Sequence, residues 1–278
     1  MGRVKRAVKA MLMTVGVSGC SGLDLLDAVT PTGGYTVDAD IPYGDGARQR
    51  LDVYRPAQPT GSAPVVVFFY GGNWESGRRE DYRFVGQSFA SQGFVAVVPD
   101  YRLYPEVRYP AFVQDGAAAV AWVHENIARF GGDPRRIVLA GHSAGAHMAV
   151  MLAVNPAFLG AERTALVGAV GIAGPYDFVP SGRNRDILDA DGGGPSAMPI
   201  DYVDGAAAPL LLLTGDADTL VLPGNSTRLA ERIRGHGGTV ALVRYPDMGH
   251  TKIIAALASP LSWLGPVRQD VLAFLREH

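Results

Sequence analysis

The residues from Arg136 to Val150 read RIVLAGHSAGAHMAV, and this stretch decides the fold. The apolar run Ile137 to Ala140 has the composition of a short buried strand, and the small residues after Ser143 are typical of a tightly packed helix. Between them stands Gly141-His142-Ser143-Ala144-Gly145, a G-x-S-x-G motif. At a sharp turn from a strand into a helix, the central serine takes a strained backbone conformation, and the glycines leave room for the crossing chain.

Ser143 is therefore the candidate nucleophile. The turn projects its hydroxyl above the sheet, and the backbone N–H of Ala144, at the start of the helix, points to where a negative oxygen would develop. The motif alone is a weak signal in a chain with 35 glycines, and a Gly-rich turn without chemistry is the alternative. The strand before the motif and the helix after it favour a catalytic serine.

Length and composition favour one large domain. The chain has 278 residues, of which 47% are hydrophobic and 19% charged, so it can bury a large core. The net charge is −2 and no basic patch lies beyond the N-terminus, so nucleic acid is not an expected partner. A single cysteine excludes an intramolecular disulfide and a cysteine-based metal site.

The N-terminal segment has the pattern of an export signal. Residues 1–9 are basic, and the apolar run Ala10 to Val17 that follows is too short to span a bilayer. The segment ends in Val17-Ser18-Gly19-Cys20, which resembles the lipobox of bacterial lipoproteins, where the cysteine becomes the lipidated first residue. Export without a lipid, and no export at all, are the alternatives.

This pattern predicts three parts along the chain. Residues 1–19 form a signal peptide, residues 20–34 form a lipidated N-terminus and linker, and residues 35–278 form the catalytic domain. Acyl chains on Cys20 would then anchor an exported protein to a membrane, facing the periplasm or the cell exterior.

Hydrophobic patterns divide the remaining chain into alternating strands and helices. Two alternating runs joined through Gly44-Asp45-Gly46 predict an antiparallel edge hairpin, and apolar runs without alternation predict strands covered on both faces. Residues 179–207 lack helical periodicity, so no sizeable lid is expected and the site should be open. The expected strands are 35–41, 49–54, 65–70, 94–98, 137–140, 166–173, 210–213 and 240–245. Besides the helix after Ser143, the expected helices are 80–92, 110–130, 226–234 and 263–277.

The strand 65–70 runs into Tyr70-Gly71-Gly72-Asn73-Trp74. A glycine pair after a central strand lets backbone N–H groups turn outward, as an oxyanion hole requires, and a plain tight turn is the alternative. The loop resembles the HGG-containing oxyanion loop of esterases in the α/β-hydrolase superfamily, especially its hormone-sensitive-lipase-like, arylformamidase-like and feruloyl-esterase-like branches. Tyr70 replaces the histidine that braces the loop in that family. The resemblance implies that the N–H groups of Gly72 and Asn73 act together with that of Ala144.

The resemblance also selects an acid and a base. The strand 210–213 runs into Thr214-Gly215-Asp216-Ala217-Asp218, and the superfamily places its acid three residues after the glycine, which favours Asp218 over Asp216. His250 lies on a Gly-flanked loop after the last expected strand and is the expected base. The order Ser143, Asp218, His250 is that of α/β-hydrolases.

Other candidate residues fit catalysis less well. Asp100 precedes the serine, in a D-Y-R-L sequence that is structural in the family, and Asp177 is more simply a residue that ties a loop. His124 is expected on a helix surface. Four aromatic residues are equally compatible with a substrate pocket and with ordinary core packing: Trp74, Tyr104, Tyr176 and Phe178.

Together, the motifs are similar to those of α/β-hydrolases over roughly residues 35–278. The resemblance implies a mostly parallel twisted sheet with helices on both faces and a minimal cap. It also implies that the chain hydrolyses a small carboxylic ester through an acyl-enzyme, without a metal or organic cofactor. An arylformamidase-like amidase on the same scaffold and a non-catalytic, anchored binding module are the alternatives.

Overall fold

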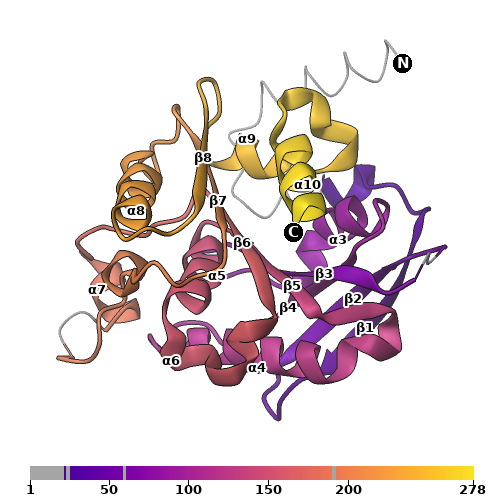
Figure 1. Cartoon of the computed structure of the whole chain (residues 1–278), viewed down its shortest axis with the longest axis horizontal. Coiled ribbons are helices and arrows are strands. Elements are labelled where there is room, and N and C mark those ends of the chain that lie inside the picture. The colour runs from indigo at the N-terminus through magenta and orange to yellow at the C-terminus, as the bar shows by residue number, and fades with distance from the viewer. Residues whose placement is uncertain (1–21, 23–25, 59–60, 190–191) are drawn as a thin grey trace.

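The computed structural model describes residues 22, 26–58, 61–189 and 192–278 (Figure 1). The expected signal peptide and Cys20 lie outside the described residues. Residues 26–30, assigned from the sequence to a linker, pack on the domain, because Leu26 is buried in the core and Asp27 accepts a hydrogen bond from Arg83 Nε at 2.6 Å.

One sheet organises the described part of the chain. It has eight strands in the order β1-β2-β4-β3-β5-β6-β7-β8. β1 pairs antiparallel with β2, β2 pairs antiparallel with β4, and every pair from β4 to β8 is parallel. The strands are β1 (Tyr35–Pro42), β2 (Arg50–Pro56), β3 (Ala63–Phe69), β4 (Val95–Pro99), β5 (Gly132–His142), β6 (Leu166–Ile172), β7 (Leu210–Gly215) and β8 (Val240–Tyr245). This topology confirms the expected α/β class and the antiparallel hairpin at the sheet edge.

Helices cover both faces of the sheet, with α4, α5 and α8 on one side and α3 and α10 on the other (Figure 1). The α-helices are α3 (Arg83–Ala90), α4 (Ala111–Asn126), α5 (Ala144–Val154), α6 (Pro156–Leu159), α7 (Arg183–Ile187), α8 (Gly224–Gly235), α9 (His250–Ala255) and α10 (Val267–Glu277). Short 3₁₀ turns lie at Arg79–Tyr82, Ile127–Phe130, Gly160–Ala165, Pro199–Tyr202 and Ser259–Leu264.

Some element boundaries differ from the sequence expectation. The expected helix 80–92 begins as a 3₁₀ turn, and the expected helix 110–130 ends as one, before Gly131 with a φ of 84°. α10 begins only at Val267, because Gly265 and Pro266 separate it from the turn that holds Trp263. Within 179–189 and 192–207, helical structure is limited to α7 and the turn Pro199–Tyr202, as expected for a minimal cap.

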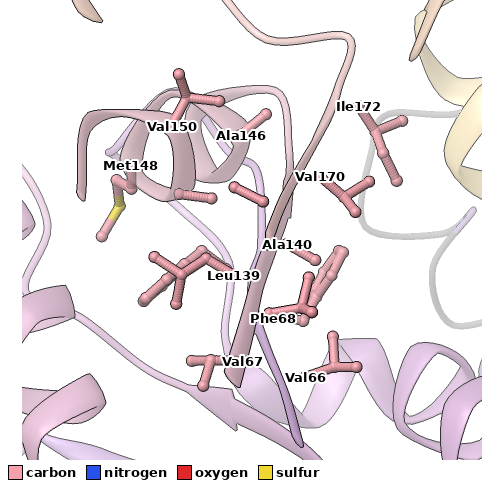
Figure 2. Packing of buried hydrophobic residues seen from close by; sticks show 14 of the residues in the cluster. Val66, Val67, Phe68, Leu139, Ala140, Ala146, Met148, Val150, Val170 and Ile172 are labelled. Carbon is pink, nitrogen blue, oxygen red and sulfur yellow. The ribbon is translucent and has the colours of Figure 1, made fainter. Parts of the chain in front are cut away.

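The core forms where α5 lies against the central strands. Every residue of α5 is buried, which agrees with its run of small and apolar side chains. Figure 2 shows Val67 and Leu139 facing this helix, while Val66 and Phe68 point to the opposite face of the sheet. Burying a side chain of this size contributes roughly 1.5–3 kcal/mol, so the strand and helix on either side of Ser143 form a rigid support.

No single described helix is long and apolar enough to cross a membrane. The pair Ala144–Val154 and Pro156–Ala165 passes the same length and composition test only together, with a bend of 82° between its parts.

Candidate active site

Ser143 occupies a sharp turn between β5 and α5. Its φ of 54° and ψ of −122° are strained for a residue with a side chain, at a cost of roughly 1–3 kcal/mol. A Cβ on Gly145 would lie 2.0 Å from the carbonyl oxygen of Phe69, and a Cβ on Gly141 would lie 2.2 Å from that of Gly145. Both positions therefore require glycine, as expected if the glycines of the motif leave room for the crossing chain.

His250 is the first residue of α9, and its Nδ1 lies 2.8 Å from Oδ2 of Asp218. The Asp218 side chain is fully buried, and its Oδ1 accepts the backbone N–H groups of Leu220 and Val221, each at 2.9 Å. A neutral imidazole that donates from Nδ1 keeps Nε2 free as a base. Asp216 instead pairs with Arg244 on β8 at 2.8 Å, near the surface.

Ser143 and His250 line one cavity of about 850 Å³. Gly72, Asn73 and Ala144 line it too, so the residues expected to supply the oxyanion donors border the same space as the serine. As the first residue of α5, Ala144 has a backbone N–H without an intrahelical acceptor. The structure thus brings the expected site residues together around this cavity, with Asp218 buried behind His250.

The loop of residues 70–77, here named the oxyanion loop, has a constrained backbone. Gly72 has a φ of 127°, and a Cβ there would lie 2.2 Å from the carbonyl oxygen of Ser76. Asn73 and Trp74 have φ values of 54° and 57°. The Gly72 carbonyl accepts the N–H groups of Glu75 and Ser76 at 3.0 and 3.1 Å, which closes the loop on itself.

Tyr70 is fully buried at the start of this loop. Its hydroxyl donates to Oδ1 of Asp100 at 2.7 Å, and its ring stacks on Tyr101 with centroids 4.7 Å apart. Burial raises the pKa of Tyr70 well above its usual value, so the phenol remains a neutral donor. Arg79 also binds Asp100, which gives this aspartate the structural role expected from the sequence.

His142, just before Ser143, was not singled out from the sequence, yet it contacts His250. The two ring centroids are 4.7 Å apart, and Nε2 of His142 lies 3.1 Å from the carbonyl oxygen of His250. Burial and the neighbouring His250 lower the pKa of His142 to about 3, so it is a neutral ring that packs against His250. The signal in the sequence was its position inside the G-x-S-x-G motif.

The four aromatic candidates separate in the structure. Phe178 is partly exposed at the cavity. Trp74 borders the cavity, but it is only 1% exposed and its ring stacks on Phe112 in the core, with centroids 5.7 Å apart. Tyr176 is fully buried in the core, and Tyr104 lies beneath the guanidinium of Arg183. His124 is exposed, as expected.

Three apolar residues of the cavity lining, Phe178, Leu220 and Leu222, are here named the apolar wall. Leu220 is 73% exposed and Leu222 is 62% exposed, although their loop is held firmly. Asn225 accepts the N–H groups of Tyr176 and Asp177 at 3.1 and 3.0 Å. It also donates to the carbonyl oxygen of Leu222 at 3.2 Å and so ties the two loops of the wall together.

Asp177 has the loop-tying role expected from the sequence. Its carboxylate and its carbonyl oxygen both accept hydrogen bonds from Arg228 of α8. Among the described residues, no group of three or more His, Cys, Asp or Glu side chains is arranged to hold a metal ion.

Comparison with known proteins places this geometry in a family. The chain is 32% identical over 244 residues to the esterase LipQ of Mycobacterium tuberculosis, covering 78% of this chain and 58% of LipQ. It is 30% identical over 251 residues to the isoprenylcysteine alpha-carbonyl methylesterase ICME of Arabidopsis thaliana, covering 81% of this chain and 58% of ICME. The chain thus spans somewhat over half the length of these relatives.

Solved structures give the same picture. A thermostable esterase from Pseudomonas putida aligns with a TM-score of 0.74 and 25% identity, over 100% of this chain and 94% of that one. The esterase Est2 of Thermogutta terrifontis aligns with a TM-score of 0.65 and 27% identity, over 80% of this chain and 85% of that one. These likenesses confirm the expected α/β-hydrolase fold.

Two family models match the sequence. The model of the prolyl oligopeptidase family matches residues 192–278. The BD-FAE model matches residues 51–233, which span β2 through most of α8 and include the oxyanion loop, Ser143 and Asp218. This chain therefore belongs to the BD-FAE family and has the α/β-hydrolase fold.

Proposed function

We propose that this protein is a serine hydrolase that cleaves carboxylic esters, with Ser143 as nucleophile, His250 as base and Asp218 as the orienting acid. The observation that carries the proposal is the 2.8 Å hydrogen bond between His250 and the buried Asp218, beside the cavity that the strained Ser143 also lines. The esterase names of the relatives and of the similar structures support it.

In the proposed mechanism, Nε2 of His250 removes the proton from Ser143 as the serine oxygen attacks the ester carbonyl carbon. The carbonyl oxygen becomes an anion that accepts hydrogen bonds from backbone N–H groups. His250 then gives its proton to the departing alcohol oxygen as the C–O bond breaks, which leaves an ester on Ser143. Water attacks this acyl-enzyme by the same sequence and releases the acid. The N–H donors are those of Gly72, Asn73 and Ala144.

The cavity suggests the kind of ester. Its volume of about 850 Å³ is within the range of small-molecule sites, roughly 300–1,000 Å³. The apolar wall includes two exposed leucines on a fixed loop. An apolar group of the substrate would cover these leucines. We infer that the preferred esters carry an apolar group of several carbons.

An activity panel tests this function against the amidase alternative. The purified protein is assayed with p-nitrophenyl acyl esters, aromatic esters and N-formyl arylamines, with Ser143→Ala as the control. Saturable ester hydrolysis that is lost in the control is the expected result. Hydrolysis of N-formyl substrates with no turnover of any ester would favour the amidase instead.

We also propose that the protein is exported and held at a membrane by acyl chains on Cys20. The support is the sequence pattern alone: a basic start, a short apolar run, and Val17-Ser18-Gly19 directly before the only cysteine. Cells expressing the wild type or Cys20→Ala are fractionated, and the mass of the mature N-terminus is measured. Acylated wild type in membranes and an unacylated variant outside them are expected, whereas a wild type without acyl mass would contradict the anchor.

A further inference from the structure

Arg48 joins the two ends of the oxyanion loop. It lies in the connection between β1 and β2, and its side chain is partly buried, with 29% exposed. Its Nη2 donates to the hydroxyl of Tyr70 at 2.8 Å and to the carbonyl oxygen of Gly77 at 2.6 Å. Because Tyr70 and Gly77 are the first and last residues of the loop, a single nitrogen of Arg48 bridges its ends.

The guanidinium of Arg48 is itself fixed in position. Its Nε donates to the carbonyl oxygen of Tyr101 at 2.9 Å, and its Nη2 lies 3.7 Å from Oδ1 of Asp100. That same Oδ1 accepts the hydroxyl of Tyr70, and the hydroxyl of Tyr101 donates to the carbonyl oxygen of Tyr70 at 2.8 Å. Arg48 thus belongs to a closed set of hydrogen bonds around Tyr70, in which the planar guanidinium presents donors in directions that a lysine cannot reproduce.

The conformation of the loop explains why its ends need support. Asn73 and Trp74 have positive φ values, which side-chain-bearing residues keep only where the surrounding structure imposes them. The ends are in close contact, because a Cβ on Gly77 would lie 2.8 Å from the ring of Tyr70. Separation of the ends would therefore release the strained residues between them.

We propose that Arg48 is a positioning residue that clasps Tyr70 to Gly77 and thereby fixes the N–H groups of Gly72 and Asn73 where the oxyanion forms. This inference rests on the proposed function. Arg48 is not among the described residues that line the cavity, so it acts through the loop. Oxyanion donors are effective because they are held in place in advance, and a displacement of about 1 Å can cost on the order of 10²-fold in rate.

The test compares Arg48→Met with Arg50→Met. Arg50 is a matched control, because it lies two residues further along, and its side chain binds Asp40 at 2.8 Å and 2.9 Å rather than the loop. With p-nitrophenyl butyrate, we expect Arg48→Met to lower kcat about 10- to 100-fold while KM changes less than about 3-fold. Arg50→Met should keep the kcat of the wild type.

A second readout does not depend on activity. Hydrogen exchange of the backbone amides in residues 72–76 should accelerate in Arg48→Met and stay at the wild-type rate in Arg50→Met. If the wild type hydrolyses no ester, the proposed function fails, and the exchange rates still decide whether the clasp exists. Unchanged kcat with unchanged exchange in a folded Arg48→Met would overturn the clasp.

Tyr70→Phe keeps the test decisive if Arg48→Met does not fold. This change removes only the hydroxyl that Arg48 and Asp100 share, so it should lower kcat in the same direction with KM nearly constant. Where Arg48→Met does fold, the double variant Arg48→Met/Tyr70→Phe should lose less activity than the product of the two single losses, because both changes remove the same bridge. Fully multiplicative losses would show that Arg48 and Tyr70 act independently and would contradict the clasp.

Discussion

Asp218 is joined to His250 by a 2.8 Å hydrogen bond, while its other carboxylate oxygen holds the backbone of Leu220 and Val221. One buried side chain therefore orients the imidazole of His250 and also fixes the loop that carries the apolar wall. Asp216, two residues earlier in the chain, has a different environment, because it pairs with Arg244 near the surface.

Substitution of these two aspartates should have very different effects. Asp218→Asn presents His250 with an amide in place of a carboxylate, and the comparable change in trypsin lowers kcat on the order of 10⁴-fold. Asp216→Asn removes an exposed ion pair and should leave kcat within about twofold of wild type. Steady-state kinetics on one ester measures both, and a larger loss for Asp216→Asn would identify that residue as the orienting acid instead.

The apolar wall should control chain-length preference. A fully buried methylene contributes roughly 0.8 kcal/mol. Because Leu220 and Leu222 are more than half exposed, we expect Leu220→Gln/Leu222→Gln to remove the contribution of about one to two methylenes, which lowers the preference for octanoyl over acetyl esters about 4- to 15-fold in kcat/KM. Two series are measured, one varying the acyl chain and one varying the alcohol, to show which part of the ester contacts the wall.

Val179→Gln is the matched control for the wall. Val179 is also apolar and 89% exposed, but it does not belong to the described cavity lining. Its substitution should leave both series unchanged. An unchanged preference in both series for the double leucine variant would refute the role of the wall.

Stability should fall in mild acid because two buried histidines resist protonation. Burial lowers the pKa of His142 to about 3 and that of His147 to about 4, against 6.5 in the unfolded chain. As the pH falls below about 6.5, the unfolded chain takes up protons that the native protein does not, so the free energy of unfolding decreases. At pH 5 the loss is on the order of 2 kcal/mol for each histidine.

Urea unfolding of His147→Gln at pH 7.5 and pH 5 measures this effect. The amide of glutamine can still donate to the carbonyl oxygen of Ala197, which lies 2.6 Å from Nε2 of His147 in the native protein. Because glutamine does not titrate, the variant should lose less stability than wild type between the two pH values. His124→Gln, at an exposed position, should behave as wild type. Equal losses in all three proteins would show that His147 does not contribute to the pH dependence.

Much of the fold could be predicted because local patterns agreed with the final packing. The apolar run before Ser143 and the small residues after it indicated a strand and a buried helix, and both form as β5 and α5. The hairpin glycines and the two-sided apolar runs similarly marked the sheet edge and its centre. In these regions the pattern of residues close in the sequence is enough to determine the secondary structure and which faces are buried.

The contacts missed from the sequence join residues far apart in the chain. Arg48 binds Tyr70, Gly77 and Tyr101, which follow it in the chain by 22, 29 and 53 positions. The carbonyl oxygen of His250 contacts His142, which is 108 positions away. Nothing in the residues around Tyr70 indicated that an arginine from the connection between β1 and β2 would support a tyrosine in place of histidine. Such pairings depend on tertiary packing, which the sequence pattern around either partner does not show.

The central claim is that Ser143 is an activated nucleophile, and covalent labelling tests it most directly. The protein is incubated with a fluorophosphonate, and its intact mass is measured by mass spectrometry. Peptide mapping after proteolytic digestion then locates the adduct. We expect one phosphonyl group per chain, on Ser143, and no label on Ser143→Ala. A wild type that stays unlabelled, or a label on another residue that persists in Ser143→Ala, would contradict the claim.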